Sequence, residues 1–284
     1  MTTPTLAETQ AVAASSNPLL NRGNRMPGET VRLPSRGKFY AEGEVLANTT
    51  EGEVLLRPIT LTDEVMMKSP DMLMQGTAIE YTFKRCSPHI ISPLDLVMPD
   101  VNFILTHLRR ISLGSDLSLT YYCSKEKCQH KQTIEVPLST FTQTSKELED
   151  AELGEAYRYV TQYDNSVVEL RPVTLRDFLK MQEFSMETMS SPEEYAKYLR
   201  RSFISIIKSV NGHTVREDIE EWLDTLPIED VKEITKKLTG IQGLGPKFEF
   251  KHKCKKCGTV NDLSTEINPT SFFIEHSDLE TEKE

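Results

Sequence analysis

Four of the five cysteines in this 284-residue chain form two close pairs, and these pairs carry the clearest chemistry in the sequence. Cys123 and Cys128 are separated by four residues, and Cys254 and Cys257 by two, with Gly258 directly after the second pair. Two thiolates that bind one Zn²⁺ at about 2.3 Å need a tight chain reversal, which such spacings supply. Gly258 suits a reversal because glycine readily adopts positive φ. Each pair is therefore predicted to form a metal-binding knuckle.

The two pairs lie 126 positions apart, much farther than in a simple zinc ribbon. We expect them to close one tetrahedral, zinc-ribbon-like site, with Zn²⁺ as the metal and an iron–sulfur cluster as the alternative. His130 and His252 leave open separate three-ligand sites, each completed by a neighbouring subunit, and free cysteines packed in the core are a further alternative. Cys86 is predicted to be a core residue. A metal with four thiolate ligands has no open position, so it would be structural.

The elements that must position the cysteines are short strands and the helices before them. An alternating pattern enters each pair, at residues 117–122 and 247–252, and a strand-like segment follows each pair. A basic amphipathic helix precedes each first strand, and Gly114 or Gly240 is expected to end it. This order predicts one hairpin around each cysteine pair.

The two hairpins belong to a longer internal repeat. Residues 54–62 read VLLRPITLT, and residues 168–175 read VELRPVTL. Each is a strand that ends at Arg-Pro, followed by a Thr that can cap a helix whose first turn carries Asp63 or Asp177. Because several such features recur in the same order, we interpret the chain as a duplication.

The rest of each copy supports an α+β fold. Helical stretches are predicted at 81–90 and 202–212, and the second copy is about 15 residues longer, with the extra length around 184–226. The fold class is therefore α+β, with two related strand-helix-helix-hairpin repeats joined through the four-cysteine site. The predicted organisation is a flexible N-terminal arm (1–30), a first repeat (31–139), a linker (140–164), a second repeat (165–274) and an acidic tail (275–284).

The composition excludes several classes of protein. The chain has 33 Lys and Arg against 43 Asp and Glu, a net charge of −10, which argues against a general nucleic-acid coat because phosphates need cationic partners. No run approaches the roughly 18–20 apolar residues of a membrane helix, and the N-terminus lacks the basic-then-apolar order of a secretion signal. Membrane proteins and secreted disulfide scaffolds are thus excluded at this stage.

A local basic cluster beside the second cysteine pair leaves one alternative function, a zinc-finger-type nucleic-acid-binding or regulatory protein. Phe248 and Phe250 interleave with this cluster, but their alternation is what a half-buried strand shows. Nucleic-acid binding is therefore the less favoured interpretation. The cluster comprises Lys247, Lys251, Lys253, Lys255 and Lys256.

The sequence contains no catalytic signature. It has no Gly-rich phosphate loop, no H-E-x-x-H and no G-x-S-x-G, and His89, His107 and His213 are isolated. We therefore predict that the protein is not an enzyme and assign no catalytic residue.

The order of motifs resembles a known family. LPSRGKFY at residues 33–40 is followed by VLLRPITLTDE at 54–64, then LRRISLGSDLSLTYYC at 108–123 and the first cysteine pair. This series is similar to the baseplate hub proteins of T4-like contractile-tailed phages, labelled T4 bacteriophage base plate protein. The resemblance covers residues 33–138 well, and the later CKKCG and INPTSFF segments look similar to the same group.

The resemblance implies a structural or assembly role at the centre of a phage baseplate. Such a protein is expected in the virion tail, and in the host cytoplasm during assembly. Its implied partners are other baseplate hub and tail tube proteins, and it would be part of an oligomer in the assembled baseplate. We expect the arm (1–30) and the 33–45 loop to make these contacts.

Overall fold

The computed structural model describes residues 28–47, 49–188, 192–241 and 243–265. Nearly all of the predicted arm, the end of the second repeat and the acidic tail lie outside the described residues. Within the described part of the chain, helices and small antiparallel sheets are mixed, which confirms the α+β class. No helix in that part is both long and apolar enough to cross a membrane.

The first helical body begins with a two-stranded antiparallel sheet in which Val31 faces Val54. Helices then pack on this sheet around a large apolar core. One of its members is Cys86, which is 2% exposed as predicted, and burial raises the pKa of its thiol to about 12. The elements are β1 (Glu29–Arg32), η1 (Thr50–Gly52), β2 (Glu53–Leu56), α1 (Leu61–Met67), α2 (Pro70–Met74), α3 (Thr77–Cys86), η2 (Pro93–Asp95) and α4 (Met98–Leu113).

Helix α4 is the central helix of this body. Pro99 lies in its first turn, where its missing N–H costs nothing, and Gly114 ends it at φ 114°, as predicted. Its buried positions recur at helical spacing and face the core. They include Val101, Ile104, Leu105 and Leu108.

The 33–45 loop is anchored to α4 through a buried carboxylate. Asp100 accepts hydrogen bonds from the Ser35 N–H at 2.9 Å, from the Ser35 hydroxyl and from the Tyr40 hydroxyl at 2.6 Å. These bonds explain why the first part of the loop is buried against the body. Its exposed residues are 38 and 41–44.

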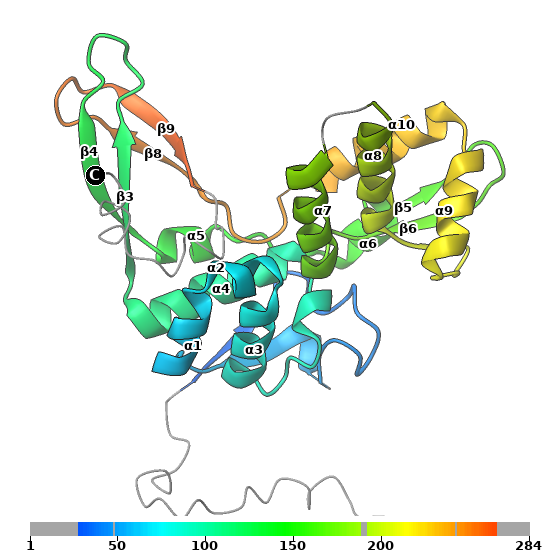
Figure 1. The fold of residues 1–284 in the computed structure, drawn as a ribbon, viewed down its shortest axis with the longest axis horizontal. Coiled ribbons are helices and arrows are strands. Elements are labelled where there is room, and N and C mark those ends of the chain that lie inside the picture. The colour runs from blue at the N-terminus through cyan, green and yellow to red at the C-terminus, as the bar shows by residue number, and fades with distance from the viewer. Residues whose placement is uncertain (1–27, 48, 189–191, 242, 266–284) are drawn as a thin grey trace, which may run out of the picture.

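Two hairpins carry the cysteine pairs. The strands are β3 (Asp116–Tyr122) with β4 (Lys131–Pro137), and β8 (Glu249–Lys253) with β9 (Val260–Ser264). Phe141, in α5 (Ser139–Gln143), packs its ring 5.1 Å from that of Phe248 and 6.1 Å from that of Phe250. These contacts attach the second hairpin to the first body. Figure 1 shows the hairpins side by side, projecting from the helical part.

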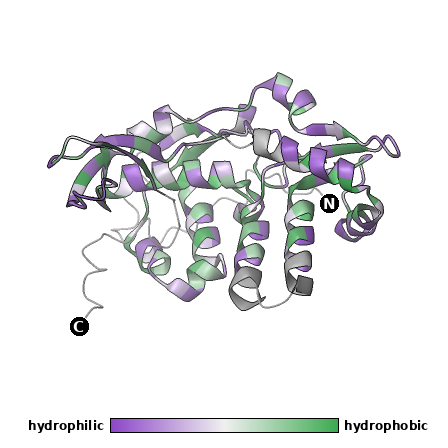
Figure 2. Ribbon diagram, turned by 90° about the horizontal axis from the view of Figure 1, so that it is seen from above, coloured by the Kyte–Doolittle hydropathy of each residue, from purple (hydrophilic) through white to green (hydrophobic). Residues whose placement is uncertain are grey.

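The second helical body contains a three-stranded sheet of order β5-β6-β7 and its own smaller core. The segment predicted as a linker over 140–164 carries α6 and β5. In Figure 2 a row of helices runs along one side of the elongated molecule, with α7 and α8 next to each other. The elements are α6 (Asp150–Glu155), β5 (Arg158–Val160), β6 (Val167–Leu170), α7 (Leu175–Thr188), α8 (Pro192–Ile206), β7 (Ile207–Val210), α9 (Arg216–Thr225) and α10 (Ile228–Ile241).

Two local predictions in this body are wrong. The predicted helix over 202–212 stops at Ile206, and the chain continues as β7, where Val210 pairs with Val168 of β6. β-Branched side chains such as Ile207 and Val210 suit this buried strand. The pairing of β7 with β6 outweighs the helical spacing of the apolar residues in this segment. Helix α10 runs on to Ile241, so Gly240 does not end it.

Matching backbone contacts support the proposed duplication. The Arg57 N–H donates to the Cys86 carbonyl at 2.8 Å, and the Arg171 N–H donates to the Ile206 carbonyl at 2.8 Å. Each Arg follows a strand, and each carbonyl closes a helix. The helix-capping Thr-x-x-Asp contact is likewise repeated, at residues 60–63 and 174–177.

Candidate metal centre

Each cysteine pair lies in a knuckle closed by backbone hydrogen bonds. The Cys123 N–H donates to the His130 carbonyl at 3.1 Å, and the Cys254 N–H donates to the Thr259 carbonyl at 2.8 Å. In both cases the N–H of the first cysteine reaches across the knuckle to the start of the returning strand. The two knuckles therefore follow one plan despite their different lengths.

The reversal after each second cysteine uses a left-handed backbone. Gly258, after Cys257, has φ 73°, as its position in the sequence predicts. Gln129 occupies the same place after Cys128 and has φ 40°. A non-glycine residue in this region is strained, so the first knuckle adopts this conformation without the residue that favours it. Glutamine is not a residue type that favours positive φ, so the conformation of Gln129 could not be predicted from the sequence.

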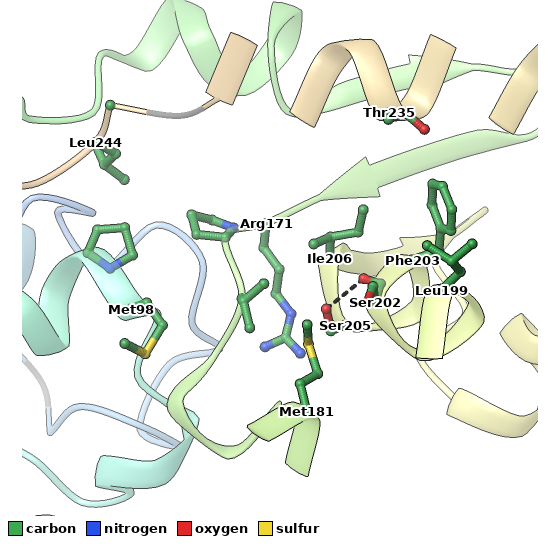
Figure 3. Close-up of a pocket in the computed structure, with 14 residues that line it drawn as sticks. Met98, Arg171, Met181, Leu199, Ser202, Phe203, Ser205, Ile206, Thr235 and Leu244 are labelled. Atoms are coloured by element: carbon green, nitrogen blue, oxygen red, sulfur yellow. Dashed lines mark hydrogen bonds between the residues drawn. The ribbon is translucent and has the colours of Figure 1, made fainter. Parts of the chain in front are cut away.

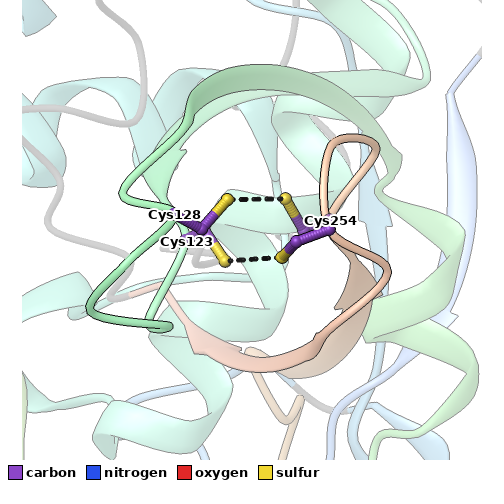
Figure 4. Close-up of side chains that lie close together, drawn as sticks. Cys123, Cys128 and Cys254 are labelled. Carbon is purple, nitrogen blue, oxygen red and sulfur yellow. Dashed lines mark hydrogen bonds between the residues drawn. The ribbon is translucent and has the colours of Figure 1, made fainter.

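The two knuckles bring the four predicted sulfurs together. Cys123 Sγ lies 3.6 Å from Cys257 Sγ, Cys128 Sγ lies 3.8 Å from Cys254 Sγ, and all four sulfurs are within 4.8 Å of one another (Figure 4). A tetrahedron with metal–sulfur bonds of about 2.3 Å has edges of about 3.8 Å. The separations are far longer than the roughly 2.05 Å of a disulfide. The donor set thus fits one tetrahedral thiophilic cation.

The thiols do not ionise alike. Hydrogen bonding with Thr259 lowers the pKa of Cys257 to about 6, so this sulfur becomes a thiolate more readily than that of Cys128. At Cys128 a backbone hydrogen bond from His130 favours ionisation, but burial and the neighbouring sulfurs outweigh it and raise the pKa to about 11. Four adjacent thiolates therefore need a bound cation to coexist at neutral pH.

Two amide side chains lock the hairpins together crosswise. Asn261 Oδ1, on the second hairpin, accepts the Ser124 N–H of the first at 2.8 Å. Gln132 Oε1, on the first hairpin, accepts the Lys255 N–H of the second at 3.3 Å. Ser124 and Lys255 each follow the first cysteine of their pair, and both amides are buried. Sequence reasoning missed them, although each stands four residues after the second cysteine of its own pair.

The contact between the hairpins extends to a third matched position. Tyr121 and His252 each stand two residues before the first cysteine of their pair, and the Tyr121 hydroxyl lies 2.7 Å from His252 Nδ1. Neither His252 nor His130 belongs to the group of candidate metal-ligating side chains found among the described residues. The geometry therefore favours one four-sulfur group over separate sites that use histidine.

The aromatic residues of the basic cluster are engaged in packing. Phe248 and Phe250 contact Phe141 and the main core, as their alternation predicts. Such rings are not displayed for stacking on bases. This removes the aromatic part of the nucleic-acid interpretation.

Of three comparisons with known proteins, one found a match. A search of curated proteins and a search of solved structures each found no match. The family model described as T4 bacteriophage base plate protein matches residues 26–274, which covers both helical bodies and both cysteine knuckles. The chain therefore belongs to the T4 bacteriophage base plate protein family.

Proposed function

We propose that this protein is a structural component of a phage baseplate hub whose two halves are joined by one structural zinc ion. Family membership supports a structural role in the baseplate and a place in the virion tail. The observation that carries the proposal of a metal is the grouping of Cys123, Cys128, Cys254 and Cys257 within 4.8 Å. The role of these four cysteines is to ligate the metal.

The sulfur separations favour a single ion over an iron–sulfur cluster. Cysteines that ligate a cluster surround several irons and sulfides, so their sulfurs stand farther apart than those around one metal ion. Here the closest pairs, at 3.6 and 3.8 Å, match the edge of a single tetrahedral site. Zinc is the metal that tetrahedral four-thiolate sites most often hold, and metal analysis distinguishes it from a single iron.

The metal contributes to stability by closing a long loop. Cys128 and Cys254 are 126 positions apart, and a link between them removes chain entropy from the unfolded state that is worth several kcal/mol, about 4–5 by the loop-closure estimate. A closed site of four thiolates leaves no position for substrate, in keeping with a role that is not enzymatic. The site thus holds the projecting hairpins in a fixed direction for assembly.

The proposed partners are other hub and tail tube proteins. The buried anchoring of Ser35 and Tyr40 to Asp100 restricts the contact surface of the 33–45 loop to its exposed residues, 38 and 41–44. The N-terminal arm is the second proposed contact element. In the assembled baseplate the protein would be part of an oligomer.

The proposal is tested by complementation in cells infected with phage that lack this protein. The variants are a deletion of residues 1–27, which leaves β1 intact, the Cys254→Ser/Cys257→Ser double variant, and Cys86→Ala as the control for loss of a thiol. We expect the first two to reduce incorporation into tails and Cys86→Ala to assemble. If the double variant entered tails as efficiently as the control, the structural role of the metal would be refuted.

A further inference from the structure

The two sulfur contacts at 3.6 and 3.8 Å both run from one hairpin to the other. They join Cys123 Sγ to Cys257 Sγ and Cys128 Sγ to Cys254 Sγ (Figure 4). Each contact therefore pairs the first cysteine of one knuckle with the second cysteine of the other. A disulfide is about 2.05 Å long, so each sulfur would have to move by less than about 1 Å to form one. The four sulfurs are thus placed for two covalent bonds between the hairpins.

Each contact also pairs a buried cysteine with a more accessible one. Among the described residues, Cys123 and Cys254 are buried, whereas Cys128 and Cys257 are only partly buried. A soluble oxidant reaches Cys128 and Cys257 first, and the sulfur that faces each of them belongs to the other hairpin. Thiol–disulfide exchange at an accessible cysteine is completed by a neighbouring cysteine that displaces the oxidant. This arrangement favours disulfides between the hairpins over disulfides within a knuckle.

Contacts that do not involve the metal hold the hairpins in this arrangement. Asn261 accepts the Ser124 N–H at 2.8 Å, and Gln132 accepts the Lys255 N–H at 3.3 Å. Each knuckle is therefore tied to the opposite hairpin directly after its first cysteine. These bonds keep the facing sulfurs close to each other when a thiolate leaves the metal.

The proposed function also exposes these sulfurs to a change in redox conditions, and the inference rests on that function. A baseplate protein is made in the host cytosol, which keeps thiols reduced, and it leaves with the released phage for surroundings in which disulfides persist. We propose that disulfide oxidants then convert the metal-bound site into two disulfides between the hairpins, Cys123–Cys257 and Cys128–Cys254, so that the two halves of the chain stay joined when the metal is lost.

The exchange balances with a glutathione-type disulfide, RSSR, as the oxidant. The thiolate of Cys257 attacks RSSR, forms a mixed disulfide and releases RS⁻. The thiolate of Cys123 then attacks Cys257 Sγ and displaces the second RS⁻. Cys128 and Cys254 react in the same way, so that four thiolates and two RSSR give two disulfides and four RS⁻, and the cation that the thiolates held is released.

The products keep the long loops of the chain closed. The partners of the two disulfides are 134 and 126 positions apart. A disulfide within one knuckle would instead close a loop of a few residues, and it would leave the hairpins without a covalent link. Oxidation in the proposed pairing therefore replaces one link between the halves by another.

Tryptic mapping of the full-length protein distinguishes the possible pairings, because lysines lie between the two cysteines of each pair and each cysteine falls in its own peptide. Protein purified under reducing conditions is treated with glutathione disulfide, remaining thiols are alkylated, and the peptides are analysed without reduction. We expect Cys123 linked to Cys257 and Cys128 linked to Cys254, with release of about one zinc per chain. Cys86→Ala is the matched control and should give the same two disulfides.

The other outcomes contradict the inference. Disulfides within a knuckle, the pairing of Cys123 with Cys254, disulfides between two chains, persistent glutathione adducts, or four free cysteines would each overturn it. Zinc-loaded protein that gave one of these results would refute the inference and leave the proposed function intact. Protein that contained no zinc but formed the two expected disulfides would refute the proposed metal, while the pairing would stand.

A second measurement tests whether the new bonds hold the hairpins together. With a chelator present, the oxidised protein should resist limited proteolysis at least about tenfold longer than the reduced protein, because linked hairpins open less often. Reduction of the oxidised protein with dithiothreitol is the control and should abolish the difference. Equal resistance of the oxidised and reduced proteins would show that the disulfides do not replace the metal.

Discussion

The two hairpins and the two helical bodies differ in how closely their halves match. In the hairpins the contacts are reciprocal, since Asn261 accepts an N–H from one knuckle and Gln132 accepts the equivalent N–H from the other. In the bodies, matched positions have different surroundings. Phe83 and Phe203 each stand three residues before the carbonyl that accepts the Arg N–H, but Phe83 is fully buried whereas Phe203 lines an open cleft of about 460 Å³ among the described residues (Figure 3). A tetrahedral site needs equal geometry from both knuckles, but a helical core has no such constraint. This difference is what we expect if the proposed metal site kept the two knuckles alike after the proposed duplication while the packing of the two bodies diverged.

The prediction with the largest expected effect is that either cysteine pair is equally necessary for metal binding, which tests the symmetry of the hairpins. Purified protein should contain about one zinc per chain, and both Cys123→Ser/Cys128→Ser and Cys254→Ser/Cys257→Ser should contain none. Each double variant removes two of four thiolates and with them a binding free energy on the order of 10 kcal/mol. Metal analysis and thermal unfolding of both variants measure the effect.

The same experiment has a built-in control and a clear contrary result. Cys86→Ala removes a thiol outside the cluster and should retain the full metal content, even though its burial makes the change destabilising. Two zincs per chain, or partial retention in either double variant, would mean that the knuckles bind metal independently.

The second prediction concerns the asymmetry of the bodies. Phe83→Ala should lower the free energy of unfolding by about 3–5 kcal/mol, because it leaves a cavity in a closed core. Phe203→Ala should cost less than about 2 kcal/mol, because its ring already borders open space. Urea unfolding of the two variants gives the comparison. Equal losses would mean that the second core is as tightly closed as the first.

The sequence predicted these two regions to different depths for a physical reason. The four cysteines and the bend at Gly258 could be predicted because they depend on local spacing in the sequence, which does not change with the position of the knuckles in the fold. The positive φ of Gln129 and the strand at Ile207–Val210 depend on tertiary contacts, which a local pattern does not contain. The cleft depends on how the helices of the second body pack, so no residue type in the sequence predicts it.

A smaller contrast between the halves lies in two buried carboxyl groups. Burial raises the pKa of Asp100 to about 6, against opposing hydrogen bonds from Ser35 and Tyr40. Burial also acts to raise the pKa of Asp230, but hydrogen bonds from Tyr159 and from nearby backbone N–H groups outweigh it and leave the pKa lowered. Each carboxylate accepts a tyrosine hydroxyl at 2.6 Å. The two therefore differ in whether burial or the hydrogen bonds have the larger effect on the pKa, and not in this shared contact.

The last prediction follows from the opposite signs of these shifts. Because the pKa of Asp100 is higher in the folded state than its ordinary 3.8, this group stabilises the fold most below pH 4 and loses that contribution as pH rises through about 6. The stability of the wild type relative to Asp100→Asn should therefore fall by about 2.4 kcal/mol between pH 4 and pH 7. Relative to Asp230→Asn it should change in the other direction, and by less, because a lowered pKa stabilises above 3.8 and is lost in acid. Urea unfolding of the three proteins from about pH 2 to pH 7 measures both slopes, because the contribution of Asp230 changes below its ordinary pKa of 3.8. Slopes of the same sign would show that the two carboxyl groups share one environment, and the contrast between the two bodies would then be confined to the cleft.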